Sequence, residues 1–508
     1  MSAQAIASIE ALFLSLLSLL GLLAGTALKP RLDYLFLLGV SYAIGLAICL
    51  LVSVLLIMLP VPFTGSILFA VLILLGVALG FYNYRFGGIT RRYLGVTLLY
   101  FVSFAGVAWL FGYYNFMVTS NDSLMMMRLG EILAYTGHLD PTMTLLGSRP
   151  ISIPVFQGIA NFLGIGIFTA LFPLLMVPML CGFLRGGWLT LTSFSVNKNA
   201  VLVFLFTGAV FLASGAFVQW NAFYINSHLA SSLYLLLFFI VVVLSFIKKE
   251  ATWLYLSSFF MAAFCLWRLE DIGLAAVFIY LLIPAVPVSD KDKLLASLAF
   301  SVPVITWLIY LYILYAPTGM FLNEKILLMI ALMVAVIFMI ILSRHYKIFG
   351  NILRFSPHLV LSAATLVLLL AVIAEPEHMA ESVDSILSNS LLGWGKWGTE
   401  WMVILPLLVL SQGLPRPIPL DSRLLASIIF FGIFLVGISY FRYPYRLNMY
   451  DSGNRIMLHI FPICVYYVIL KFGLSTGNGL MSQSPNNTPV EEPSGFADEA
   501  YHSDTLLQ

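Results

Sequence analysis

The chain has 508 residues, of which 61% are hydrophobic and only 9% charged, and its mean hydropathy is +1.01. A soluble globular protein carries about 25% charged residues, so the composition excludes a soluble domain and predicts an all-α polytopic membrane protein. The net charge of +2 comes without a long basic run and the four cysteines lie in apolar runs without CxxC spacing, so we expect no nucleic-acid partner, disulfide framework or zinc site.

Apolar runs that are long enough to cross about 30 Å of hydrocarbon predict about 13–15 transmembrane helices. The runs lie at residues 11–28, 35–59, 65–82, 93–117, 164–184, 200–219, 229–247, 253–267, 272–287, 294–315, 325–343, 358–374, 401–411, 422–440 and 456–471. The runs at 253–267, 272–287 and 401–411 are short for a span, so each is a half-helix or part of a longer helix.

Lysine and arginine concentrate in the odd-numbered loops and after the last span, where the positive-inside rule places the cytoplasm. The pattern predicts a multi-pass protein of the plasma or inner membrane with its N-terminus outside and its C-terminus in the cytoplasm. Four segments then share the outer face: 118–163, 268–271, 375–400 and 441–455. Residues 475–508 are predicted to form a disordered cytoplasmic tail.

Asp122 follows an aromatic-rich helix end that suits the lipid headgroup level. Residues 123–135 predict a short amphipathic helix along the membrane surface, with Arg128 and Glu131 on its polar face. Its apolar face is expected to carry Leu124, Met127, Ile132 and Tyr135. Asp122 has two compatible interpretations: the N-cap of this helix, or a catalytic carboxylate held at the membrane surface.

Two turns follow this surface helix. His138 and Asp140 lie in the first turn, which Gly137 opens, and Arg149 lies in a Gly-Ser-Arg-Pro turn before the chain re-enters the bilayer. Arg149 is either an anion ligand or an ordinary interfacial arginine.

The turn at 268–271 places Arg268 beside Glu270 and a second acid between two short apolar runs. Charges in lipid are costly, so this turn is expected to be buried in protein or to reach a water-filled cavity. The alternative is that these charges only neutralise one another.

Three arginines in the last outer segment, at positions 442, 446 and 455, break the positive-inside trend. Arg455 and His459 are four residues apart and therefore share a helix face, where a guanidinium group can bind a phosphate through two hydrogen bonds. The alternative is an arginine that extends to the interface beside a packed histidine.

With these residues identified, the chain resembles the GT-C superfamily of polyprenyl-phosphate-sugar-dependent glycosyltransferases, which includes protein mannosyltransferases and lipid A aminoarabinose transferases. Besides Asp122, the resemblance rests on the stretches 137–141, 149–180, 266–275 and 452–462, in that order. It implies N-terminal accessory transmembrane helices at 1–92 and a GT-C-like catalytic core at 93–474. Three departures stand out: three spans precede the one that leads to Asp122, no large soluble C-terminal domain follows, and Ser123 stands where many members have a second acid.

The resemblance implies an inverting sugar transfer on the extracytoplasmic face, from a polyprenyl-phosphate carrier to an acceptor hydroxyl on a glycan, lipid or protein, with membrane lipid around it. Asp122 is then the catalytic base, and the donor phosphate is bound by Arg455, Arg149, Arg446 and His459. Roles in acceptor binding or structure fall to Glu131, His138, Asp140, Arg268 and Glu270. One carboxylate with arginines is sufficient for this chemistry, so neither a metal nor a cofactor is expected.

Other function classes remain open at this stage. A transporter or a lipid-linked glycan flippase also needs many spans, but its charges are expected between helices near mid-bilayer. A polysaccharide polymerase or ligase uses a related donor and a large late outer loop. A non-enzymatic scaffold leaves the outer arginines unexplained.

Overall fold

The computed structural model is helical over the residues that it describes, and it contains twenty helices. The described residues are 1–28, 32–86, 93–114, 116–139, 151–316, 322–414, 419–442, 446–449 and 451–478. The prediction of an all-α polytopic membrane protein is confirmed.

Within these described ranges, eleven helices are long and apolar enough to cross a membrane. They are α1 (Ala3–Ala27), α2 (Tyr34–Met58), α3 (Gly65–Phe86), α4 (Leu94–Tyr114), α7 (Met176–Ser193, preceded by the 3-10 turn Pro173–Leu175), α10 (His228–Lys248), α13 (Asp290–Tyr315), α14 (Leu322–His345), α16 (Ser356–Ala374), α19 (Asp421–Arg442) and α20 (Ser452–Asn478). A twelfth span is formed if α8 (Lys198–Ser214) and α9 (Ala216–Ala222), which meet at 63°, count as one.

Shorter apolar helices account for the three predicted runs that are short for a span. They are α11 (Ala251–Trp267), α12 (Asp271–Leu282, continued by the 3-10 turn Ile283–Ala285) and α18 (Glu400–Ser411). The remaining four helices are α5 (Asn121–Thr136), α6 (Ser152–Phe162), α15 (Lys347–Arg354) and α17 (Pro376–Leu391). Every predicted run therefore corresponds to a helix, although by length and composition only eleven or twelve qualify as full spans.

One predicted span is misplaced. The run at 164–184 does not begin a helix, because Gly164 and Gly166 adopt left-handed conformations with φ of 69° and 76°. The short helix α6 ends before this run, at Phe162. The membrane-spanning helix α7 begins only at Met176, after the 3-10 turn that starts at Pro173. At the other end of the chain, α20 continues to Asn478, and the rest of the predicted tail lies outside the described residues.

The helix predicted at 123–135 forms as α5 and ends at Gly137, which has a φ of 74°. The apolar face expected to lie on the membrane surface is largely exposed, with Leu124 at 52% and Tyr135 at 94%. A different face is buried in protein, because a Cβ atom at Gly130 would lie 2.5 Å from both Gln157 and the carbonyl oxygen of Pro154. The face that carries this glycine therefore packs against α6.

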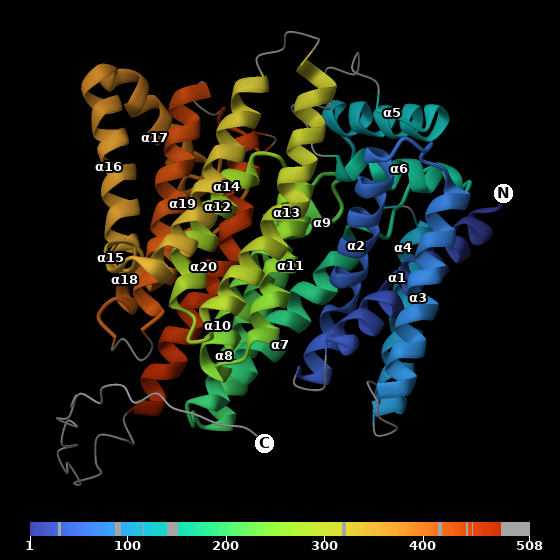
Figure 1. Ribbon diagram of the computed structural model, residues 1–508, viewed down its shortest axis with the longest axis horizontal. Coiled ribbons are helices and arrows are strands. Elements are labelled where there is room, and N and C mark those ends of the chain that lie inside the picture. Colours follow the sequence, from blue (N-terminus) through green and yellow to red (C-terminus); the bar gives the residue numbers. More distant parts are fainter. Residues whose placement is uncertain are drawn as a thin grey trace, which may run out of the picture.

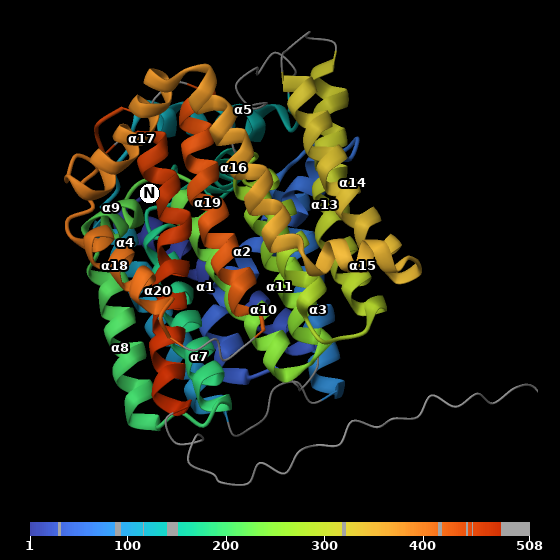
Figure 2. The same cartoon turned by 90° about the vertical axis from the view of Figure 1, so that its left-hand side faces the viewer.

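The centre of the bundle is formed by α10 and α20, which are buried over most of their length and pack against each other. Figure 1 shows α5 and α6 lying across one end of the bundle, above the long helices that run roughly vertically. In the side view, α13 and α14 lie together at one flank, while α8 lies at the other (Figure 2). The start of α10 approaches α5, because Ser123 of α5 donates to the carbonyl oxygen of Ile225, three residues before α10.

Helices α1 and α2 cross through small residues, as expected where membrane helices approach closely. A Cβ atom at Gly45 would lie 1.8 Å from the carbonyl oxygen of Leu17, and the hydroxyl groups of Ser18 and Ser41 are 2.8 Å apart. No residue larger than glycine fits at position 45 unless α1 and α2 move apart.

We predict that Gly45→Val lowers the free energy of unfolding by about 1–3 kcal/mol through overpacking. Gly106→Val in α4 is the matched control, because a Cβ atom at Gly106 has nothing within 4 Å. Thermal unfolding of both variants in the same detergent checks this. Equal unfolding temperatures for the two would contradict the close α1–α2 crossing.

Candidate functional site

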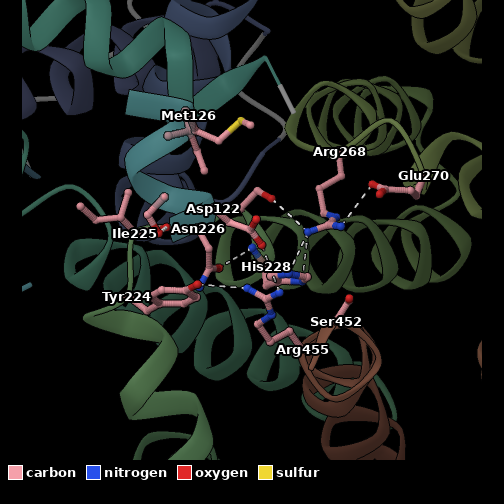
Figure 3. A pocket seen from close by; sticks show the side chains of 13 residues that line it. Asp122, Met126, Tyr224, Ile225, Asn226, His228, Arg268, Glu270, Ser452 and Arg455 are labelled. Atoms are coloured by element: carbon pink, nitrogen blue, oxygen red, sulfur yellow. Dashed lines mark hydrogen bonds and ion pairs between the residues drawn. The ribbon is translucent and has the colours of Figure 1, made fainter. Parts of the chain in front are cut away.

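A polar cavity of about 130 Å³ lies at the end of the bundle that carries α5. Its walls come from α5, the start of α6, the α9–α10 connection, the α11–α12 turn and the first turn of α20 (Figure 3). The lining residues are Asp122, Ser123, Met126, Ile153, Tyr224, Ile225, Asn226, Ser227, His228, Arg268, Glu270, Ser452 and Arg455. Segments more than 300 residues apart in sequence thus share one small polar space.

Backbone pairing holds the segment before α5 against the segment before α10. The N–H of Val118 donates to the carbonyl oxygen of Phe223 at 2.7 Å, and the N–H of Ile225 donates to that of Val118 at 3.1 Å. The buried hydroxyl of Ser123 then donates to the carbonyl oxygen of Ile225 at 2.6 Å. A carboxylate cannot donate such a bond, so position 123 serves here to join the two segments rather than to supply a second acid.

Asp122 is not the N-cap of α5. Ser120 holds that position, and its side chain accepts from the N–H of Ser123 at 3.3 Å. Asp122 lies instead in the first turn, where the helix dipole favours a negative charge. Its side chain is 46% exposed, so the carboxylate borders the cavity and also reaches solvent.

Arg455 enters the cavity from the first turn of α20. The residue before it, Asn454, is held by two side-chain hydrogen bonds. Its amide accepts from the indole N–H of Trp397 and donates to the carbonyl oxygen of Gly395. The guanidinium of Arg455 donates to the hydroxyl of Tyr224 at 3.1 Å and lies 3.8 Å from the carboxylate of Asp122. Its side chain is only 10% exposed, which is a costly position for a charge unless it is well paired.

Arg268 approaches from the opposite wall, at the C-terminus of α11 (Figure 3). Its Nη1 atom lies 2.8 Å from Nε2 of His228, and its Nη2 atom lies 3.2 Å from the carboxylate of Glu270. Among the described residues, the Nε–H groups of both Arg268 and Arg455 lack a hydrogen-bond acceptor. Buried donors normally find an acceptor, so the hydrogen bonding of both guanidinium groups is incomplete in this structure.

The structure brings together four of the predicted site residues: Asp122, Arg455, Arg268 and Glu270 all line the cavity. His459 does not line it, because its fully buried ring lies behind His228. The predicted phosphate contact of His459 stays a prediction that this position does not support.

The remaining predicted residues lie elsewhere. The backbone N–H of Arg446 donates to Asp451, and its side chain does not line the cavity. Glu131 forms an exposed ion pair with Arg128, and His138 is exposed beyond the end of α5. Arg149 and Asp140 lie outside the described residues.

A group of polar lining residues in one connection was missed from the sequence: Tyr224, Asn226, Ser227 and His228. They occupy the α9–α10 connection, which reads Phe-Tyr-Ile-Asn-Ser-His between two apolar runs. The signal was a polar interruption with a histidine in an even-numbered loop, on the same predicted side as the other site segments. Because this connection is short, its sequence was not distinguished from that of an ordinary link between two helices.

Comparison with models of known families, with curated protein sequences and with solved structures gives no match. The GT-C resemblance therefore stays a prediction from the motifs quoted above.

We predict that Ser120→Ala lowers the free energy of unfolding by about 1 kcal/mol, because it removes the N-cap of α5 and the partner of the Tyr224 hydroxyl. Ser120→Thr keeps a hydroxyl acceptor at the N-cap and is the comparison, with an unfolding free energy expected within about 0.5 kcal/mol of wild type. Chemical denaturation in detergent measures both. Equal losses for Ser120→Ala and Ser120→Thr would contradict the capping role of Ser120.

Proposed function

We propose that this protein is a membrane glycosyltransferase that moves a sugar from a polyprenyl-phosphate carrier to an acceptor hydroxyl on the extracytoplasmic face, with inversion. One observation carries the proposal: a partly exposed carboxylate and two buried guanidinium groups line a single cavity at the end of a helical membrane bundle. This is the charge set that such a transfer needs.

The chemistry assigns a role to each group. The acceptor oxygen attacks the anomeric carbon of the sugar while its proton passes to Asp122. The bond between that carbon and the phosphate oxygen breaks, and its electron pair leaves with the polyprenyl phosphate. Arg455 and Arg268 stabilise the negative charge that grows on this phosphate. Attack from the face opposite the leaving phosphate inverts the anomeric centre.

The geometry supports different roles for Asp122 and Arg455 within the cavity. Asp122 is the more exposed group and can release its proton to solvent after each turnover, whereas Arg455 is nearly buried. Charge stabilisation is strongest where water is excluded. Compared with the sequence-based set, Arg268 takes the place that Arg446 and His459 were expected to fill.

The direct test incubates the purified protein in lipid nanodiscs with a panel of radiolabelled polyprenyl-phosphate sugars and candidate acceptors. The proposal predicts transfer of label with release of free polyprenyl phosphate for at least one donor. Asp122→Asn is predicted to lower the transfer rate about 10²-fold or more, because the amide cannot take the acceptor proton. Glu131→Gln on the same helix is the control and is expected to keep the wild-type rate.

Arg455→Ala provides a second arm of the same experiment. Loss of one charge-stabilising group typically lowers the rate about 10²–10³-fold, while the Asp122 carboxylate remains in place. Full transfer activity in Asp122→Asn would remove this carboxylate from the mechanism. An unchanged response to donor concentration and an unchanged rate in Arg455→Ala would remove the phosphate role.

A transporter or lipid-linked glycan flippase is the second candidate. It is favoured by the buried polar side chains of Asp271, His459 and His228, because ionisable groups inside membrane bundles often serve transport. A flippase would move a labelled donor across a vesicle membrane without releasing free carrier. The transfer assay separates these two outcomes.

A further inference from the structure

Three buried side chains form a line behind Arg268. Nε2 of His228 lies 2.8 Å from Nη1 of Arg268, nearer than its Nδ1 at 3.3 Å. Nδ1 of His228 lies 3.1 Å from Nε2 of His459, and Nδ1 of His459 lies 3.4 Å from Oδ1 of Asp271. All three residues are at most 2% exposed, so no bulk water competes for these contacts.

The Arg268 end of this line fixes the direction of its two hydrogen bonds, from Arg268 to His228 and from His228 to His459. Arginine can only donate, and the contact between His459 and Asp271 is a charge contact outside hydrogen-bond geometry. His228 must therefore accept through Nε2 and carry its proton on Nδ1. His459 must likewise accept through Nε2 and carry its proton on Nδ1, toward Asp271. Both rings are neutral in this arrangement.

An additional proton on either ring breaks the contact between His228 and Arg268. If His459 takes it up, its Nε2–H donates to Nδ1 of His228, which must then hold its own proton on Nε2, facing the N–H of Arg268. If His228 takes it up, both of its ring nitrogens donate. In either case two donors face each other and Arg268 loses its His228 acceptor.

The helix ends favour the neutral rings. His228 is the first residue of α10 and Asp271 the first residue of α12. A helix N-terminus carries partial positive charge, which disfavours an imidazolium and favours a carboxylate. The charged groups around His228 are Arg268, Glu270 and Asp271 from the α11–α12 turn, Arg455 from α20 and Asp122 from α5. The nearest of these is the Arg268 cation.

We propose that Asp271, His459 and His228 form a polar relay whose task is to hold the Arg268 guanidinium in the cavity, ready for the phosphate of an isoprenyl-phosphate ligand. His228, His459 and Asp271 are positioning residues, since they act through Arg268. Only the identity of the ligand rests on the proposed function. The direction of the relay follows from its own contacts.

The first test reads the tautomers directly. Full-length protein labelled with ¹⁵N-histidine is reconstituted in nanodiscs at pH 7.5, and His228→Gln and His459→Gln identify two of the seven histidine signals. The relay predicts that both rings are neutral with the proton on Nδ1. An imidazolium, or a proton on Nε2 of either ring, overturns it.

The second test measures binding of farnesyl phosphate by calorimetry, with farnesol as the uncharged control. His459→Phe keeps the ring but breaks the relay, and it is expected to weaken binding about tenfold. His459→Gln retains one acceptor and one donor and is expected to recover most of the affinity. His378→Phe is the matched control, because the ring of His378 contacts Tyr440, through its carbonyl oxygen and its ring, and does not line the cavity.

Equal affinities of wild type and a folded His459→Phe for farnesyl phosphate would overturn the relay. The relay would also be overturned if His459→Gln bound farnesyl phosphate as weakly as His459→Phe. Thermal unfolding establishes whether each variant is folded, and where His459→Phe is unfolded, the tautomer measurement on wild type is the deciding test. If wild type shows the predicted tautomers but does not bind farnesyl phosphate, the proposed function fails while the relay stands.

Discussion

Two guanidinium groups buried at helix ends in a membrane bundle impose the main constraint on this structure. An uncompensated charge in such a place is costly, so the surrounding chain must supply acceptors for Arg268 and Arg455. Arg455 has the Tyr224 hydroxyl and the Asp122 carboxylate, and Arg268 has His228 and Glu270. Every segment that lines the cavity contributes to this compensation, directly or by holding a contributor in place.

The compensation depends on connections between helices more than on the helices themselves. The backbone pairing of Val118 with Tyr224 fixes the distance between α5 and α10. Asn454 fixes the start of α20 through Trp397 and Gly395. These polar contacts lie close to the cavity and position the side chains that line it. The apolar helices, such as α1 and α2, pack through small residues elsewhere.

Hydropathy alone located a helix at every predicted run, since apolar length is a physical requirement for crossing a bilayer. The run at 164–184 was placed too early because hydropathy does not register the left-handed turns at Gly164 and Gly166. The face of α5 that packs against α6 was not predicted for a related reason: a glycine counts little in an apolar pattern, yet Gly130 decides which face can approach α6.

The candidate site was only partly predictable. Asp122, Arg268, Glu270 and Arg455 were identifiable because isolated charges in an apolar chain stand out. Their meeting in one cavity depends on tertiary packing that no local pattern reports. His228 and Tyr224 were missed because uncharged side chains in a short connection give a weak signal. His459 was assigned to the ligand, whereas its ring lies behind that of His228.

The most direct measurement is an experimental structure of the protein in nanodiscs with farnesyl phosphate bound. The account predicts phosphate density within about 2.7–3.2 Å of nitrogen atoms from both Arg268 and Arg455, with the Asp122 carboxylate bordering the same space. Phosphate bound at another place, or two guanidinium groups separated by packed side chains with no shared cavity, would contradict it.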